Sequence, residues 1–262
     1  MPILLTIIIF CVGAMLGSFL GVALDRYNTG RSMGGRSICF TCNKKLGPHE
    51  LIPVLSYMMQ GGKCRGCKSK VSFEYVLIEL VAGLTAVLIF FKFWGAYTMY
   101  SPFDFFLMIA LYTLIFSFLI VIVFYDIRHL VIPDGFVFAF IGFSFFGMFF
   151  LRDVNLFQDI LAGIAICAPF AFIWAISGGK WMGFGDVKLA LGMGWLLGLS
   201  AGVAALMLSF WIGAIIGILL MVFKGHKYMM KTELPFGPFL VLGTYIVFFA
   251  SLDLNSIMNI FS

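Results

Sequence analysis

Long apolar stretches recur along this chain and constrain its fold more than any other feature. Most run for about 18 to 25 residues, which is roughly the length that an α-helix needs to cross the hydrocarbon core of a bilayer. The chain has 262 residues, of which 62% are hydrophobic and only 11% are charged. One soluble core of this size could not bury so much apolar surface. We therefore expect an all-α polytopic membrane protein, with lipid as the solvent for most of its surface.

The pattern predicts about eight transmembrane helices. The first apolar stretch lacks a basic start and has no convincing cleavage site, so we interpret it as a retained helix rather than a signal peptide. The expected organisation is a first transmembrane helix over residues 1–24, a small polar domain over 25–72, and a membrane-embedded domain over 73–262. The predicted spans are roughly 3–24, 73–92, 103–125, 134–151, 157–177, 186–199, 201–223 and 236–259.

Glycines recur in three of these spans, where they would let helices approach closely. They are Gly142 and Gly147 in the fourth span, and Gly192, Gly194, Gly198, Gly213 and Gly217 in the sixth and seventh.

Basic residues indicate the orientation, because Lys and Arg accumulate in cytoplasmic loops. Placing the loop between the first two spans in the cytoplasm leaves only Lys92 and Arg152 outside among 17 basic residues. Both termini are then expected outside. The net charge of +5 does not indicate nucleic-acid binding, because the basic residues lie in loops between spans instead of forming one stripe. The residues expected inside are Arg26, Arg31, Arg36, Lys44, Lys45, Lys63, Arg65, Lys68, Lys70, Arg128, Lys180, Lys188, Lys224, Lys227 and Lys231.

The polar segment over 25–72 contains two C-x-x-C pairs, Cys39 with Cys42 and Cys64 with Cys67. Each pair can place two sulfurs on one metal ion, and the chain between them can return the second pair to complete a tetrahedron. A segment this short could hardly fold without help, so the pattern predicts a structural zinc site. Two structural disulfides are the alternative, which the reducing cytoplasm disfavours.

Only 12 residues of this chain are acidic, and two of them stand in suggestive contexts where an apolar span meets the expected cytoplasmic side. Asp126 follows the third span, and Asp186 opens the sixth. Two close carboxylates share a proton, so that one can activate water while the other polarises a carbonyl group. This chemistry would support peptide hydrolysis at the cytoplasmic boundary. The alternative is that Asp186 caps its helix while Asp126 pairs with Arg128 or His129.

Several motifs in one order resemble the type IV prepilin peptidases, which are bacterial membrane enzymes of the GxGD aspartic-protease class. The resemblance covers nearly the whole chain. Its motifs are Gly17-Ser18-Phe19-Leu20, the two cysteine pairs, Ile52-Pro53-Val54-Leu55-Ser56-Tyr57, Glu79, Asp126, Ile132-Pro133-Asp134, Gly183-Phe184-Gly185-Asp186-Val187-Lys188-Leu189 and Pro235-Phe236-Gly237-Pro238.

This resemblance implies that Asp126 and Asp186 are the catalytic pair of an aspartic endopeptidase in the bacterial inner membrane. The implied substrates are prepilins or pseudopilins of type IV pilus and type II secretion systems, from which the enzyme removes a short basic leader after a glycine. Many family members then methylate the new amino terminus with S-adenosylmethionine. The active site is expected to face the cytoplasm, where the leader would be held.

Glu79 lies inside the second span, where a carboxylate needs a partner. In the family, the corresponding glutamate is associated with methyl transfer, and a salt bridge or a hydrogen bond between helices is the alternative. The chain departs from the family pattern at Phe40, Glu74 and Val76, which makes methyl transfer a weaker expectation than proteolysis. Asp134 is expected to cap the fourth span. Lys188 could contact lipid phosphates or tune Asp186.

Three other functions are open at this point. A GxGD intramembrane protease of unrelated substrates would use the same carboxylates, although the cysteine segment argues against it. A non-enzymatic membrane scaffold could use the zinc domain to dock a cytoplasmic partner. A transporter would need acids near the bilayer midplane and repeated halves with broken helices, and neither feature is clear in the sequence.

Overall fold

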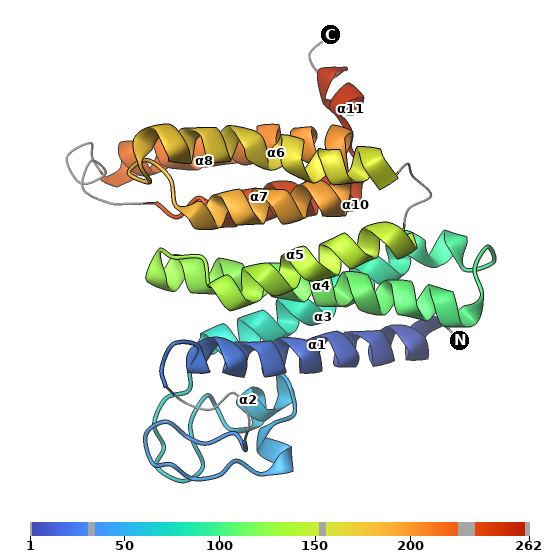
Figure 1. The fold of residues 1–262 in the computed structure, drawn as a ribbon. Helices are drawn as coiled ribbons and strands as arrows, with labels where there is room; N and C mark the ends of the chain where they lie inside the picture. Colours follow the sequence, from blue (N-terminus) through green and yellow to red (C-terminus); the bar gives the residue numbers. More distant parts are fainter. Residues whose placement is uncertain (1, 31–34, 152–155, 225–233, 260–262) are drawn as a thin grey trace. The chain divides into compact units, whose positions relative to one another are not determined.

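The computed structural model describes residues 2–30, 35–151, 156–224 and 234–259, and over these residues the fold is helical (Figure 1). No strand forms among them, and two isolated antiparallel β-bridges join Ile38 to Lys45 and Lys63 to Lys70. The all-α expectation is therefore confirmed. Of the basic residues used for the predicted orientation, Arg31, Arg152, Lys227 and Lys231 lie outside the described residues.

The chain divides into two compact units, residues 1–121 and 122–262. The predicted division into a first helix, a polar domain and a membrane-embedded domain, with boundaries at residues 24 and 72, is a different kind of division and stays a prediction. The first unit contains α1 (Pro2–Arg26), η1 (Pro48–Glu50), α2 (Leu55–Met59), α3 (Phe73–Phe93), η2 (Trp94–Ala96) and the greater part of α4 (Pro102–His129).

Helices α1 and α3 form the framework of the first unit. Their backbones approach closely because α1 carries glycines at the contact. A Cβ atom on Gly13 would lie 2.6 Å from Cβ of Ala86, and one on Gly17 would lie 2.7 Å from Cβ of Ala82. Small residues on both sides allow this packing. The motif Gly17-Ser18-Phe19-Leu20 thus includes a helix contact.

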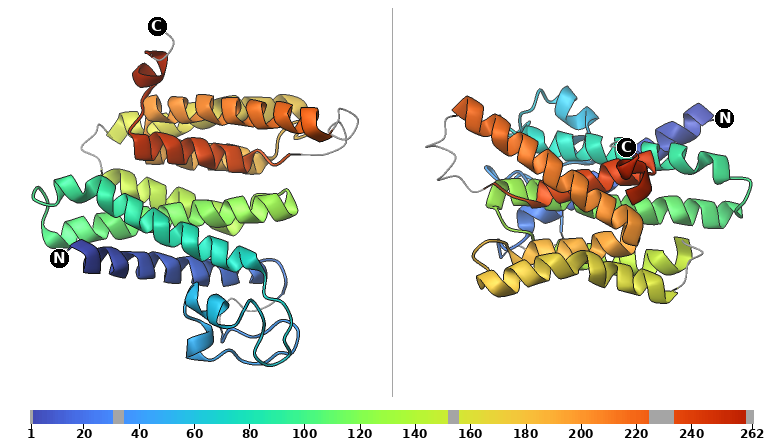
Figure 2. Two further views of the ribbon diagram at one scale, coloured as in Figure 1. Left: turned by 180° about the vertical axis from the view of Figure 1, so that it is seen from behind. Right: turned by 90° about the horizontal axis from the view of Figure 1, so that it is seen from above.

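The second unit contains the end of α4, followed by α5 (Asp134–Leu151), α6 (Leu156–Ser177), α7 (Phe184–Leu197), α8 (Leu199–Lys224), α10 (Gly237–Ala250) and α11 (Leu254–Met258). Helix α7 packs against α5, α6 and α10, and α10 also packs against α8. Figure 2 shows the same helices from two further sides.

The predicted role of glycines in packing is confirmed for some positions and wrong for others. A Cβ atom on Gly194 would lie 2.6 Å from Cα of Gly163, and one on Gly192 would collide with the ring of Phe140. Around Gly142 and Gly217, in contrast, the described part of the chain places no atom within 4 Å of such a Cβ. These two glycines do not mediate a close approach.

Eight spans are not confirmed. Among the described residues, five helices are long and apolar enough to cross a membrane: Ile3–Arg26, Phe73–Ala96, Pro102–His129, Leu156–Ser177 and Leu199–Phe223. Helices α7 and α10 have 14 residues each and would extend about 21 Å, less than the hydrocarbon thickness of about 30 Å.

The last predicted span, 236–259, differs from the structure because its backbone turns. Ser251 adopts a left-handed conformation with φ of 52° and ends α10. Asp253 then caps α11, since its carboxylate accepts a hydrogen bond of 2.8 Å from the backbone N–H of Ser256. Two shorter helices therefore replace one long one.

Candidate active site and metal centre

Asp126 lies in the last turn of α4 and is only 4% exposed. The helix ends three residues later because Leu130 takes a left-handed conformation with φ of 56°, and its N–H donates to the carbonyl oxygen of Asp126 at 2.8 Å. A left-handed residue is a common way to close a helix, although leucine is an unusual choice for it. The turn thus places a buried carboxylate at the end of a long apolar helix.

Asp186 lies in the first turn of α7 and is partly exposed. The N-cap position of this helix is occupied by Gly183, whose carbonyl oxygen accepts from the N–H of Asp186 at 3.2 Å. The alternative that Asp186 itself caps the helix is therefore wrong. A carboxylate in the first turn is stabilised by the positive end of the helix dipole.

Ile132 contacts residues next to both aspartates. A Cβ atom on Gly185 would lie 2.7 Å from Cβ of Ile132, and one on Gly237 would lie 3.4 Å from its Cδ1. The side chain of Ile132 therefore packs against the residue before Asp186 and against the start of α10. The charges of Asp126 and Asp186 are near enough to interact electrostatically. The structure thus brings both carboxylates into one site.

Gly237, the first residue of α10, lies directly against Asp126. Its backbone N–H is within hydrogen-bonding reach of the Asp126 carboxylate, and a Cβ atom at this position would lie 2.5 Å from Oδ2 of Asp126. Only glycine lets the amide approach so closely. Sequence reasoning missed this contact, although the string Pro235-Phe236-Gly237-Pro238 was a signal for it.

Lys188 lies one turn after Asp186 and contacts α5. Its ammonium group forms an ion pair with the carboxylate of Asp134, the first residue of α5. The same nitrogen lies 4.9 Å from the ring centre of Phe138 and 5.2 Å from that of Phe184. A cation over aromatic faces is attracted to them. The beginnings of α5 and α7 are therefore joined beside the two aspartates.

His129 and Arg128 were the alternative partners of Asp126. The ring of His129 packs against that of Tyr125 at a tilt of 38°, with 4.4 Å between the ring centres. Arg128 lies in the last turn of α4, where a positive charge complements the helix dipole.

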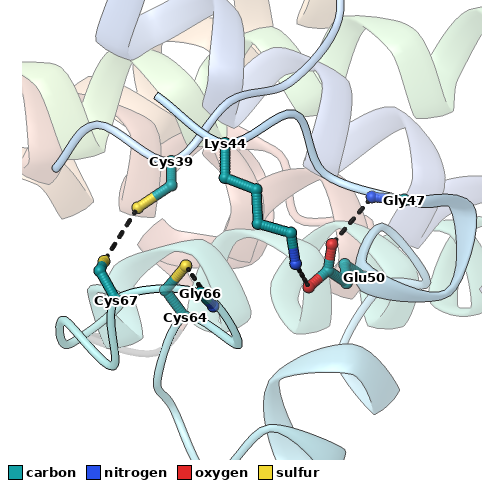
Figure 3. Close-up of polar contacts among 7 residues, drawn as sticks. All are labelled: Cys39, Lys44, Gly47, Glu50, Cys64, Gly66 and Cys67. Atoms are coloured by element: carbon teal, nitrogen blue, oxygen red, sulfur yellow. Dashed lines mark hydrogen bonds and ion pairs between the residues drawn. The ribbon is translucent and has the colours of Figure 1, made fainter. Parts of the chain in front are cut away.

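The four predicted metal ligands come together in the first unit. The sulfur atoms of Cys39, Cys42, Cys64 and Cys67 all lie within 4.8 Å of one another, and those of Cys39 and Cys67 are 3.8 Å apart (Figure 3). A tetrahedral site with Zn–S bonds of about 2.3 Å requires sulfur atoms about 3.8 Å apart. All four cysteines are free thiols in the structure, so the disulfide alternative is not formed. The donor set fits zinc.

The two cysteine pairs lie in two separate turns that have the same backbone geometry. In the first turn, the N–H of Cys39 donates to the carbonyl of Lys44, and that of Asn43 donates back to Cys39, both at 2.9 Å. The second turn repeats both bonds between Cys64 and the residues four and five positions later, again at 2.9 Å. Asn43 and Lys68, the equivalent fourth residues, are left-handed with φ of 54° and 57°. The repeated geometry aims both pairs of sulfurs at one point.

Hydrogen bonds lower the pKa of two of the thiols, those of Cys39 and Cys67. The backbone N–H groups of Cys42 and Thr41 hold the pKa of Cys39 at about 6, and the hydroxyl and backbone of Ser69 lower the pKa of Cys67. Thiolates, not thiols, bind metal ions. The same hydrogen bonds would therefore favour metal binding at neutral pH.

An ion pair between Lys44 and Glu50 joins the first cysteine turn to the short helix η1 (Figure 3). The carboxylate of Glu50 accepts from the N–H of Gly47 at 2.9 Å and from the ammonium group of Lys44 at 3.1 Å. These two contacts, the amide first, lower the pKa of Glu50. Glu50 thus caps the short helix η1, which follows this turn.

Glu79 is 8% exposed and accepts a hydrogen bond of 2.7 Å from the backbone N–H of Val54. Val54 has φ of 62° and ψ of −53°, and the N–H of Leu55 donates to the carbonyl of Pro53 at 2.6 Å. These values describe a classic γ-turn, a rare and strained conformation, most of all for a β-branched residue. Glu79 therefore holds a strained turn against α3 through a hydrogen bond to a residue outside the helices, and its roles in methyl transfer or in a contact between helices stay predictions.

Two family profiles match the chain. The Bacterial Peptidase A24 N-terminal domain matches residues 11–93, and the Type IV leader peptidase family matches residues 113–218. A prepilin leader peptidase/N-methyltransferase of Aeromonas salmonicida (strain A449) is 31% identical over 237 residues, which cover 85% of this chain and 72% of the relative. The chain belongs to the type IV leader peptidase family. This finding confirms the resemblance seen in the sequence motifs.

Other relatives of this type IV leader peptidase carry the same name. The prepilin leader peptidase/N-methyltransferase of Bacillus subtilis (strain 168) is 30% identical over 242 residues, 92% of each chain. That of Pseudomonas aeruginosa is 28% identical over 217 residues, 80% of this chain and 70% of the relative. No solved structure matches the chain.

Proposed function

We propose that this protein is a prepilin leader peptidase that uses Asp126 and Asp186 as an aspartic-protease pair. The observation that supports this proposal most strongly is that Ile132 packs against Gly185, the neighbour of Asp186, and against Gly237, which contacts Asp126, so that the two carboxylates lie near enough to interact electrostatically. Membership of the type IV leader peptidase family supports the same activity. The substrates would be prepilins or pseudopilins with a basic leader ahead of an apolar helix.

In the proposed reaction, the two aspartates share one proton before the substrate binds. The ionised carboxylate removes a proton from water, and the water oxygen attacks the carbonyl carbon that follows the leader. The protonated carboxylic acid donates its proton to the carbonyl oxygen. When the tetrahedral intermediate collapses, the C–N bond breaks, the proton taken from water passes to the departing amine, and one hydroxyl of the intermediate returns its proton to the other carboxylate as the C=O bond re-forms. The N–H of Gly237 would fix the orientation of Asp126 throughout.

The new amino terminus would then be methylated. S-adenosylmethionine, when bound, would supply the methyl group: its S–CH3 bond would break as the N–CH3 bond forms, the thioether S-adenosylhomocysteine would leave, and the amine would release one proton. The names of the relatives support this second activity. Glu79 is the proposed residue for methyl transfer, because it is a buried carboxylate beside the metal-binding segment. Its hydrogen bond to Val54 would set its orientation.

Cys39, Cys42, Cys64 and Cys67 would hold one structural zinc ion in the polar segment between α1 and α3. Zinc would lock the two turns and supply much of the folding free energy of residues 35–72. The excess of basic residues in this segment supports a cytoplasmic position, with the termini on the opposite side of a bacterial inner membrane and the aspartate pair facing the cytoplasm. A basic leader retained in the cytoplasm would reach the pair there.

A peptide assay tests the proposed activities. Purified protein would be incubated with a synthetic prepilin peptide that carries its leader, with and without S-adenosylmethionine, and the products analysed by mass spectrometry. We expect cleavage after the glycine in both reactions, and a product heavier by one methyl group only when the cofactor is present.

The same assay separates the alternatives. Cleavage within the apolar helix would indicate an intramembrane protease of another kind. If the peptide stays intact under conditions where a characterised relative cleaves it, the result would favour the non-enzymatic scaffold.

A further inference from the structure

A short apolar face lies within the otherwise polar segment that binds the metal. Residues 51–62, LIPVLSYMMQGG, contain no charged side chain. Helix α2 lies inside this stretch, and three of its five residues point large apolar side chains outward: Leu55 is 56% exposed, Met58 is 70% exposed and Met59 is 69% exposed. Leu51 and Ile52 are exposed as well. Such a surface on a polar domain indicates an interaction site.

The hydrogen bond from Val54 to Glu79 fixes how far along α3 this face lies. Glu79 is six residues after Phe73, where α3 begins, which corresponds to about 9 Å along the helix axis. The span from Phe73 to Ala96 has 24 residues and a length of about 36 Å, against a hydrocarbon thickness of about 30 Å. If the excess is shared between both ends, Glu79 lies about 6 Å inside the hydrocarbon boundary.

Val54 immediately precedes α2, so α2 is held at nearly the same depth. A second contact shows that α2 rises from this level toward the hydrocarbon boundary, because the ring of Tyr57 packs edge-on against that of Phe73 at the start of α3, with 6.1 Å between the centres. Figure 1 likewise shows α2 alongside the α1–α3 pair rather than beyond its end. The apolar face is therefore level with the part of α3 that enters the bilayer.

We infer that α2 is inserted into the lipid bilayer, with Leu55, Met58 and Met59 among the acyl chains just below the head groups. Interfacial helices bury their apolar faces about 5–10 Å into this region. The residues that follow the face supply complementary charge, because Lys63, Arg65, Lys68 and Lys70 would meet anionic head groups. Glu79 and the strained turn at Val54 would hold the inserted segment in place, so that the metal-binding segment rests on the membrane surface.

Lipid contact can be tested on the full chain in vesicles of phosphatidylethanolamine and phosphatidylglycerol that contain a phosphatidylcholine with a diazirine on its acyl chain. After irradiation, labelled peptides are mapped by mass spectrometry. Residues 51–62 should be labelled several-fold more than residues 63–70 of the second cysteine turn. The segment of α1 around Phe19, which is 65% exposed, is the positive control. In parallel, hydroxyl radicals in the water should oxidise Met58 and Met59 several-fold less in vesicles than in urea.

A matched pair of variants tests whether the labelling of residues 51–62 depends on the apolar face. Met58→Asp adds a charge to the apolar face and should lower the labelling of residues 51–62 several-fold, whereas His49→Asp adds the same charge nearby and should leave it unchanged. The inference is overturned if residues 51–62 are labelled no more than residues 63–70 while the Phe19 segment is labelled. Rapid oxidation of Met58 and Met59 in vesicles would also overturn it, and would leave the face for a protein partner such as a second copy or the substrate.

Discussion

Replacing Gly237 by alanine probes the proposed catalytic site without changing any charge. The new Cβ atom would lie 2.5 Å from Oδ2 and 3.3 Å from Cγ of Asp126, whereas ordinary contacts begin near 3.4 Å. The carboxylate or the start of α10 must therefore move by about 0.9 Å. A displacement of about 1 Å at a reacting group can lower the rate about 10²-fold, or about 2.7 kcal/mol. We expect Gly237→Ala to lower kcat/KM for leader cleavage by this amount.

Gly217→Ala is the matched control, because the described residues place no atom within 4 Å of a Cβ at that position. It lies within α8, where alanine should stabilise the helix by about 0.5–1 kcal/mol. Cleavage of the leader peptide by both variants would be followed by mass spectrometry over a range of substrate concentrations. Wild-type kcat/KM for Gly237→Ala would refute the role of this glycine in positioning Asp126.

Three further predictions concern the metal centre, Glu79 and Asp134. Cys64→Ser should lose the bound zinc measured by elemental analysis, while Cys167→Ser should keep it, and equal zinc in both would contradict the ligand set. Glu79→Gln should retain leader cleavage and the acceptor for the Val54 amide but lose methylation of the product, so that unchanged methylation would remove Glu79 from that step. Asp134→Asn breaks a partly exposed ion pair worth about 0–1 kcal/mol and should leave cleavage near the wild-type rate, whereas abolished cleavage would implicate a third carboxylate.

Features that depend on local sequence were predictable. The helices follow from long apolar stretches, because a backbone in lipid must satisfy its own hydrogen bonds. The cysteine cluster follows from two C-x-x-C pairs, because each pair needs only a short turn to aim two sulfurs at one metal ion. Asp126 and Asp186 were singled out because ionised residues beside a span are costly and because both lie in motifs expected at the cytoplasmic boundary.

Features that depend on contacts between distant residues were not predictable from the sequence. Gly237 is separated from Asp126 by more than a hundred residues, and only packing reveals that its amide faces that carboxylate. The hydrogen bond from Val54 to Glu79 also depends on packing, because the two residues are 25 positions apart in the sequence. The division of the last predicted span was also missed, since apolar composition continues through Ser251 although the backbone turns there.

The central claim is that Asp126 and Asp186 act together on one scissile bond. The most direct measurement is the rate of leader cleavage by Asp126→Asn, Asp186→Asn and the double variant, with zinc content and helicity recorded for each. Each single substitution should lower kcat about 10²- to 10⁴-fold, and the double variant should be no slower than the slower single variant. Wild-type cleavage by either single variant, with its fold intact, would contradict the claim.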